Sequence, residues 1–294
     1  MRVAAGAAAL IALAGGACGD DGAEEAATTT TAAADAAPSR IVSLSPTATE
    51  MLFAIGAGDQ VVAVDDQSTY PAEAPKTDLS GFKPNVEAIA THNPDLVVIS
   101  EAGGELADSL ARVKVRTLAA PAATSLDDTY EQLSQLGDAT GHRAEADKVV
   151  AGMKQRIAAI AGSVPAGAKG ATYYHELDPS YFSATSKTFI GSVYALLGLE
   201  NIADAADADG AGYPQLSAEY IVQADPDLIF LADTKCCQQS AATVAARDGW
   251  GGITAVRNGA VIALDDDVAS RWGPRIVEFL EAVSALVTKA EKAA

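Results

Sequence analysis

Residues 86–99, VEAIATHNPDLVVI, recur in altered form as residues 218–231, AEYIVQADPDLIFL, at a constant offset of 132 positions. The two copies share Glu, Ile, Pro, Asp and Leu at equal places, and each ends in a short apolar run. Two copies are too few for a solenoid, which needs three or more stacked units. The repeat instead predicts two similar lobes within one chain.

The sequence around the first copy alternates between short β-like runs and helical stretches. Residues 41–44 and 61–64 have the composition of strands, and Ser45-Pro46 is a typical helix start for a segment that ends before Gly56. A helix over 86–91 then leads into a third strand over 96–99. Strands that alternate with helices predict an α/β fold whose sheets are mainly parallel.

A longer helix is predicted between the two lobes. Apolar residues recur at helical spacing from 144 to 161, which corresponds to a helix of about 27 Å. Such a linker is stiff and limits how far the lobes can hinge. The folded domain is therefore expected at 38–294, with an N-lobe at 40–124, a linker helix region at 125–165 and a C-lobe at 166–294.

The N-terminal residues indicate export. Met1-Arg2, an apolar run and small residues up to position 17 are typical of a cleaved signal peptide, and the run is shorter than the roughly 20 residues that span a bilayer. The small residues before Cys18 resemble a bacterial lipoprotein signal, in which this cysteine carries the lipid; an ordinary cleaved signal is the alternative, since Gly15 stands where such signals prefer Leu. Residues 18–37 are rich in Ala, Thr, Asp and Glu and are expected to form a flexible tether.

Composition excludes several classes of protein. The 294 residues are 49% hydrophobic and 20% charged, so the chain can bury a core and is not disordered as a whole. A net charge of −19 repels phosphate backbones, which argues against a nucleic-acid binder. Three cysteines and three histidines leave little for a disulfide framework or a metal cage, and no nucleophile elbow, Walker loop or His-Glu-x-x-His motif is present. We therefore expect neither an enzyme nor a bound cofactor.

An ordered set of short motifs resembles the helical-backbone class of ABC-importer solute-binding proteins, the family that captures cobalamin, ferric siderophores and haem. The motifs are RIVSLSPTATE (40–50), YP (70–71), GFKPNVEAI (81–89), NPDLV (93–97), YPQLSAE (213–219), PDLI (226–229) and RWGPR (271–275). The resemblance implies a monomer on the outer face of the cell membrane, held there by its lipid, or else in the periplasm. It also implies delivery of a metal chelate from a cleft between the lobes to a permease dimer with a cytoplasmic ATPase.

The resemblance also assigns roles to two glutamates. In the family, a glutamate at the Glu50 position and one at the Glu219 position meet arginines on the permease. Both lie at or near predicted helix starts, where the helix dipole favours a carboxylate that projects into solvent. The alternative is that the dipole alone accounts for them.

Ligand contacts are expected where loops from both lobes face each other at the ends of the strands. The candidates are aromatic side chains for apolar contact and cations or a histidine for polar groups: Tyr70, Phe82 and Lys83 in the N-lobe, and Tyr174, His175, Tyr181, Tyr213, Lys235, Arg271 and Trp272 in the C-lobe. Core packing is the alternative for any single aromatic residue. Tyr213 lies where cobalamin-binding members carry an aromatic residue, whereas Gly81 stands where they often have Trp. We expect cobalamin or another corrinoid narrowly ahead of a ferric siderophore, with haem third.

Cys236-Cys237 follows the strand at 228–231 and is expected at the rim of the cleft, as a vicinal disulfide or as two small buried thiols.

Two other functional classes stay open at this point. A cofactor-binding enzyme on a nitrogenase-like or chelatase-like two-lobed fold would need clustered Cys or His and would lack an export signal. A sensor lipoprotein would have no transport partner.

Overall fold

The computed structural model describes residues 37–101 and 104–293, with side chains described as far as residue 289. The predicted signal peptide, Cys18 and nearly all of the tether lie outside these residues. Residues 37–294 form one compact unit. It contains two sheets, of strand order β3-β2-β1-β4-β5 and β7-β6-β8-β9, in which every pair of neighbouring strands is parallel. The predicted two-lobed α/β fold is confirmed.

The N-lobe alternates strands and helices as the sequence predicts. Its elements are β1 (Ile41–Ser43), α1 (Pro46–Ala54), η1 (Gly58–Gln60), β2 (Val61–Asp65), β3 (Lys76–Leu79), α2 (Val86–Ala90), β4 (Leu96–Ile99), α3 (Gly104–Arg112) and β5 (Arg116–Ala119). Ser45 caps α1, because its side chain accepts from Ala48 N, and Pro46 fills the first helical position, where no backbone N–H is needed.

The C-lobe has a shorter sheet and more short helices. Its elements are η2 (Ala166–Ala168), β6 (Thr172–Glu176), α6 (Phe189–Ala195), β7 (Glu200–Asn201), η3 (Ile202–Ala206), α7 (Ala218–Ala224), β8 (Leu228–Leu231), α8 (Thr234–Cys237), α9 (Ala241–Ala245), η4 (Trp250–Gly252), α10 (Thr254–Arg257), β9 (Val261–Ala263), α11 (Asp266–Ala269) and α12 (Ile276–Ala293). No helix within the described residues is long and apolar enough to cross a membrane.

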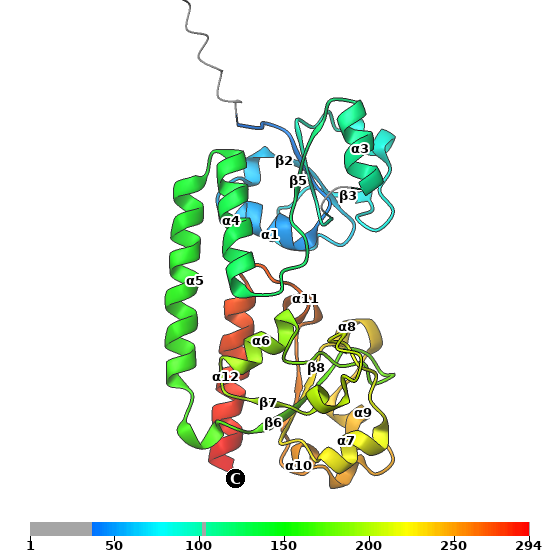
Figure 1. Ribbon diagram of the computed structural model, residues 1–294, viewed down its shortest axis with the longest axis vertical. Coiled ribbons are helices and arrows are strands. Elements are labelled where there is room, and N and C mark those ends of the chain that lie inside the picture. Colours follow the sequence, from blue (N-terminus) through cyan, green and yellow to red (C-terminus); the bar gives the residue numbers. More distant parts are fainter. Residues whose placement is uncertain (1–36, 102–103, 294) are drawn as a thin grey trace, which may run out of the picture. The chain divides into compact units, whose positions relative to one another are not determined.

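Two helices connect the lobes. Helix α4 (Leu126–Thr140) turns at Gly141, which has φ +82°, into α5 (Arg143–Ser163), a helix about 32 Å long. Close approach requires glycine at Gly137, where an added Cβ would lie 2.6 Å from Ala146 Cβ. Figure 1 shows α5 beside α4 at one end and beside α12 at the other. The structure therefore contains the helix predicted over 144–161 within α5, and α4 occupies the rest of the region 125–165.

The apolar residues of the N-lobe sheet alternate between its two faces. Ile41, Leu96 and Val98 pack toward α1 and the linker helices, whereas Val42 and Val97 pack toward α2 and α3. A parallel sheet that is covered on both faces needs such continuous apolar runs. This burial explains why strands β1 and β4 were readable from the sequence.

The internal repeat has a structural cause. Strand β1 pairs with β4 at Ile41↔Leu96, and β6 pairs with β8 at Tyr173↔Leu228, so the register of the central strands is conserved at the offset of 132. In each copy, the aspartate just before β4 or β8 accepts a hydrogen bond from the backbone at the start of the neighbouring strand, β1 or β6. Asp95 Oδ1 accepts from Arg40 N at 3.0 Å, and Asp227 Oδ2 accepts from the equivalent backbone N–H, that of Thr172, at 2.9 Å. The repeated Pro-Asp thus forms the same contact between two neighbouring strands in both lobes.

Candidate ligand-binding site and lobe contact

The loops after the carboxyl ends of the two sheets meet each other. Thr69, which follows β2, donates from Oγ1 to Asp267 Oδ2 on α11 at 3.4 Å, and Arg271 donates to the carbonyl oxygen of Gln67 at 3.1 Å. In parallel sheets, ligands bind outside the carboxyl ends of the strands. These contacts therefore place the carboxyl edges of the two sheets face to face.

Three of the candidate aromatic residues are exposed on this side of the molecule. Tyr70 follows β2, Phe82 follows β3, and Tyr213 lies in the C-lobe between η3 and α7. Their exposed fractions are 44%, 86% and 50%, which are high for side chains of this size. Lys83, beside Phe82, is also exposed. These residues come from both lobes, as a two-sided cleft requires.

A small hollow of about 110 Å³ lies under Phe82 in the N-lobe. Leu44 and Ile99, at the carboxyl ends of β1 and β4, form part of its wall together with Glu101 and Leu106. Gly81 lies against this wall, and a Cβ there would be 2.7 Å from Leu44 O and 2.7 Å from Asp65 Oδ2. Any side chain at position 81 would require the backbone to shift. The aromatic side chain of this loop is that of the next residue, Phe82.

Two predicted ligand contacts, Tyr174 and His175, are wrong. Both lie in β6 and are fully buried. Tyr174 packs edge-on against Trp250, and His175 Nδ1 lies 2.9 Å from the hydroxyl of Tyr194. Burial lowers the pKa of His175 to about 4, so this imidazole is neutral at pH 7. Because β6 has a strand on each side and is covered on both faces, its neighbouring side chains all enter the core.

The prediction that Glu50 projects into solvent is also wrong. Glu50 is 3% exposed and lies in the second turn of α1 rather than at its start. Its Oε1 accepts from Arg271 Nη1 at 2.8 Å and from Arg275 Nη1 at 3.4 Å. Burial raises the pKa of Glu50, and the two arginines act in the opposite direction. Glu50 is therefore an internal contact between the lobes and not an accessible docking carboxylate.

The segment that carries Arg271 and Trp272 is held against the N-lobe and the linker. Trp272 Nε1 donates to Gln132 Oε1 at 3.0 Å, and Trp272 O accepts from Thr129 Oγ1 at 2.9 Å. The Arg271 side chain is only 10% exposed and pairs with Glu50 and Asp267. Both residues lie at the junction of the lobes, where these contacts link the segment to the N-lobe and to α4.

Lys235 and Tyr181 are also engaged within the C-lobe. Lys235 Nζ lies 2.8 Å from Asp265 Oδ1 and 3.0 Å from Asp267 Oδ2, although its side chain is half exposed. Tyr181 stacks on Trp250 with ring centroids 5.7 Å apart. These contacts fix the loops that follow β6 and β8.

A buried charged cluster beneath these loops was missed at the sequence level. Glu176, the last residue of β6, accepts from Arg247 Nη1 and Nη2 at 2.6 Å each. The Arg247 guanidinium lies 4.5 Å from the centre of the Trp250 ring and 5.4 Å from that of Tyr181. A signal was available in the charged last residue of the segment TYYHE (172–176), since burial of such a residue demands a partner.

Asp233 belongs to the same cluster, and its carboxyl group has a raised pKa. The residue is fully buried, and neither carboxylate oxygen has a hydrogen-bond partner among the described residues. Burial, and then the negative charge of Glu176, raise the pKa of Asp233 to about 7. Burial and the neighbouring negative charge therefore both favour the neutral form of the Asp233 carboxyl group.

Glu219 is exposed at the second position of α7, whose cap is Ser217. It borders a hollow of about 320 Å³ together with Val222 and Asp248. The offset of 132 relates Glu219 to Glu87, which is exposed at the second position of α2, whose cap is Asn85. The two lobes thus present one exposed carboxylate each at equivalent helix starts.

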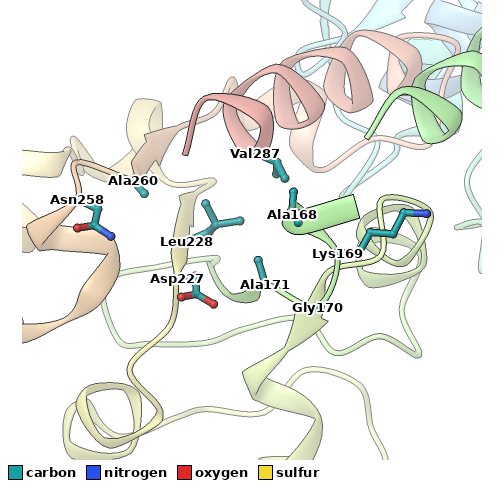
Figure 2. A pocket seen from close by; sticks show the side chains of 10 residues that line it. Ala168, Lys169, Gly170, Ala171, Asp227, Leu228, Asn258, Ala260 and Val287 are labelled. Atoms are coloured by element: carbon teal, nitrogen blue, oxygen red, sulfur yellow. The ribbon is translucent and has the colours of Figure 1, made fainter. Parts of the chain in front are cut away.

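A cavity of about 300 Å³ lies at the opposite edge of the C-lobe sheet (Figure 2). Ala168 and Val287 line it on one side, and Asp227 and Leu228, at the amino end of β8, line it on the other. Its position excludes it from the face where the two lobes meet. Among the described residues, no group of three or more His, Cys, Asp or Glu side chains is placed to hold a metal ion.

The sequence matches the periplasmic binding protein family over residues 41–268. It is similar to the uncharacterized ABC transporter substrate-binding lipoprotein YvrC of Bacillus subtilis, with 32% identity over 253 residues that cover 83% of this chain and 78% of the relative. A cobalamin-binding protein of Halobacterium salinarum is 35% identical over 254 residues, which cover 83% of this chain and 68% of the relative.

Two solved structures extend the likeness to the fold. A possible iron-binding (periplasmic solute-binding) protein from Staphylococcus epidermidis has a TM-score of 0.73 at 27% identity, and the match covers 85% of this chain and 98% of that one. The periplasmic vitamin B12-binding protein BtuF of Vibrio cholerae has a TM-score of 0.68 at 26% identity, with 87% and 98% covered.

Proposed function

The chain belongs to the periplasmic binding protein family, and from this premise we propose that it is the extracytoplasmic substrate-binding component of an ABC importer. It captures a metal chelate and delivers it to a permease dimer driven by a cytoplasmic ATPase. The observation that supports this role best is the pair of facing sheet edges, which present exposed aromatic side chains from both lobes. The protein itself acts as a monomer and is held at the membrane by a lipid on Cys18.

A corrinoid is the ligand that we favour, followed by a ferric siderophore and then haem. Phe82 and Tyr213 offer apolar surface to a large, partly flat ligand, and Tyr70 offers the part of its ring that Arg275 leaves uncovered. The tight site at Gly81 cannot hold the Trp that cobalamin-binding members often carry, and Phe82 stands beside it. The similarity to a cobalamin-binding protein of Halobacterium salinarum favours the same ligand class.

The ligand class is tested by titrating the domain of residues 38–294 with cyanocobalamin, a ferric hydroxamate and haemin, followed by tryptophan quenching and visible spectra. We expect one of the three to bind, and Tyr213→Ala or Phe82→Ala to weaken that binding by about tenfold each, because each removes a large apolar contact. Leu196→Ala is the matched control, since this exposed side chain precedes β7 at the opposite edge of the sheet. Equal affinity of the control and the two cleft variants would contradict this placement of the ligand.

Docking on the permease is assigned to Glu219 and, in place of Glu50, to Glu87. Both carboxylates are exposed, and both occupy the second position of a capped helix at the repeat offset of 132. Exposed carboxylates of this kind suit a basic surface on a partner. Glu87→Ala with Glu219→Ala should abolish ligand uptake by cells while the purified variant keeps its ligand affinity. Normal uptake by the double variant would refute the docking assignment.

A further inference from the structure

Cys236 and Cys237 form a disulfide at the end of α8. They are the only cysteines of the chain apart from Cys18. Cys236 is exposed and Cys237 is half-buried, so a reagent or a partner protein can reach the pair. Such a bond closes a small ring that contains the peptide bond between the two residues, and its reduction frees the backbone torsions within that ring.

The amino end of α8 is fixed independently of the disulfide. The carboxylate of Asp266 accepts from the backbone N–H groups of Thr234 at 2.9 Å, Lys235 at 2.8 Å and Cys236 at 3.1 Å. A change at the cysteines therefore cannot easily move this end of the helix. Such a change instead moves the carboxyl end of α8, where Gln238 adopts φ +55° and ends the helix.

A chain of hydrogen bonds leads from this carboxyl end to the buried charged cluster. Gln239 Nε2 donates to Cys237 O at 3.2 Å, and Gln239 Oε1 accepts from Arg247 Nη2 at 2.8 Å. The same guanidinium holds Glu176 and covers the Trp250 ring. The Gln239 side chain thus links the accessible sulfur pair to the buried ion pair.

We propose that Cys236–Cys237 is a thiol–disulfide exchange site whose redox state sets the position of Gln239 and, through it, of Arg247. The reaction partner is a dithiol–disulfide protein outside the cytoplasm. A cysteine thiolate attacks one sulfur of the partner's disulfide and expels the other as a thiolate, and the second cysteine then attacks the mixed disulfide. The two cysteines lose two protons and two electrons, and the partner's disulfide becomes two thiols. The proposal does not depend on which ligand the cleft binds.

The test compares the oxidised and the reduced protein in a Trp272→Phe background, where Trp250 is the single tryptophan. Dithiothreitol should expose two thiols that react with maleimide, and an oxidised dithiol protein should remove them again. On reduction we expect amide exchange over 234–250 to accelerate by about tenfold and the emission of Trp250 to shift, because Arg247 loses a fixed partner.

Gln239→Leu separates the proposed path from direct quenching of tryptophan by a nearby disulfide. In this variant the thiols should form and disappear as before, whereas exchange over 241–250 and the Trp250 emission should no longer depend on redox state. The proposal is overturned if the cysteines do not exchange with a protein disulfide. It is equally overturned if reduction changes nothing beyond residue 239, or if the response survives in Gln239→Leu.

Discussion

Asp233→Asn should stabilise the protein at pH 8. Wild-type Asp233 is fully buried beside Glu176, and its pKa is raised from the usual value near 4 to about 7. A carboxyl group whose folded pKa is raised contributes stability that is fully present below its unfolded pKa and is lost as the pH rises through about 7. The full loss corresponds to about three pKa units, or about 4 kcal/mol at pH 8.

The asparagine side chain keeps the shape of the carboxyl group and cannot ionise. Its amide can also donate to the neighbouring carboxylate of Glu176. We expect the free energy of unfolding of Asp233→Asn at pH 8 to exceed that of the wild type by about 2–4 kcal/mol. The upper value is the full loss given above, and the lower value allows for water that reaches the site. At pH 4 the variant and the wild type should differ by less than about 1 kcal/mol, because both side chains are then neutral.

Urea unfolding of both proteins from pH 4 to pH 8 measures this difference, and subtraction cancels the other titrating groups. Asp248→Asn is the matched control, because this carboxylate is exposed, and its difference from wild type should stay within about 0.5 kcal/mol at every pH. A difference between Asp233→Asn and wild type that does not grow with pH would refute the reasoning. A variant less stable than wild type at pH 8 would refute it as well.

Three further substitutions test the packing of the same structure by urea unfolding. Glu50→Ala should lower the free energy of unfolding by about 2–4 kcal/mol, because two arginines lose their shared carboxylate; a loss below about 0.5 kcal/mol would show that the lobe contact adds no stability. Arg247→Met should lower the free energy of unfolding by about 3–5 kcal/mol, because it leaves the buried Glu176 and Asp233 without a cation. Arg143→Met, the control at a half-exposed ion pair, should lower it by less than about 1 kcal/mol. Gly81→Ala should cost about 1–3 kcal/mol, because its Cβ would meet a carbonyl and a carboxylate oxygen at 2.7 Å. Gly152→Ala, in open space on α5, should instead stabilise by about 0.5–1 kcal/mol, and the reverse order of the two glycine variants would contradict the close contact.

The sequence predicted the parts of the fold whose signal is local. Strands β1, β2 and β4, and β8, which repeats β4, are short apolar runs in the middle of the sheets, and burial on both faces makes such runs continuous. Helix α5 was visible through its periodic apolar positions. Strands β3 and β5 were missed, because they lie at the sheet edges and contain exposed charged residues such as Lys76 and Arg116.

The candidate site was predicted less well, because burial depends on what the rest of the chain covers. Tyr174 and His175 were selected for their chemistry, but the neighbouring strands enclose them. Glu50 was assigned to solvent, because nothing near it in sequence reveals Arg271, which is 221 positions away. The repeat already related Glu87 to Glu219 at the offset of 132. An equal position in a repeat does not show whether a side chain is exposed.

Equilibrium dialysis of the purified domain against cyanocobalamin, a ferric hydroxamate and haemin is the most direct test of the proposed function. We expect saturable binding of one chelate per protein molecule with a Kd of about 1 μM or tighter, which corresponds to a binding free energy of about −8 kcal/mol. Failure to bind any of the three chelates at concentrations about a hundredfold higher would contradict the assignment as a metal-chelate importer component.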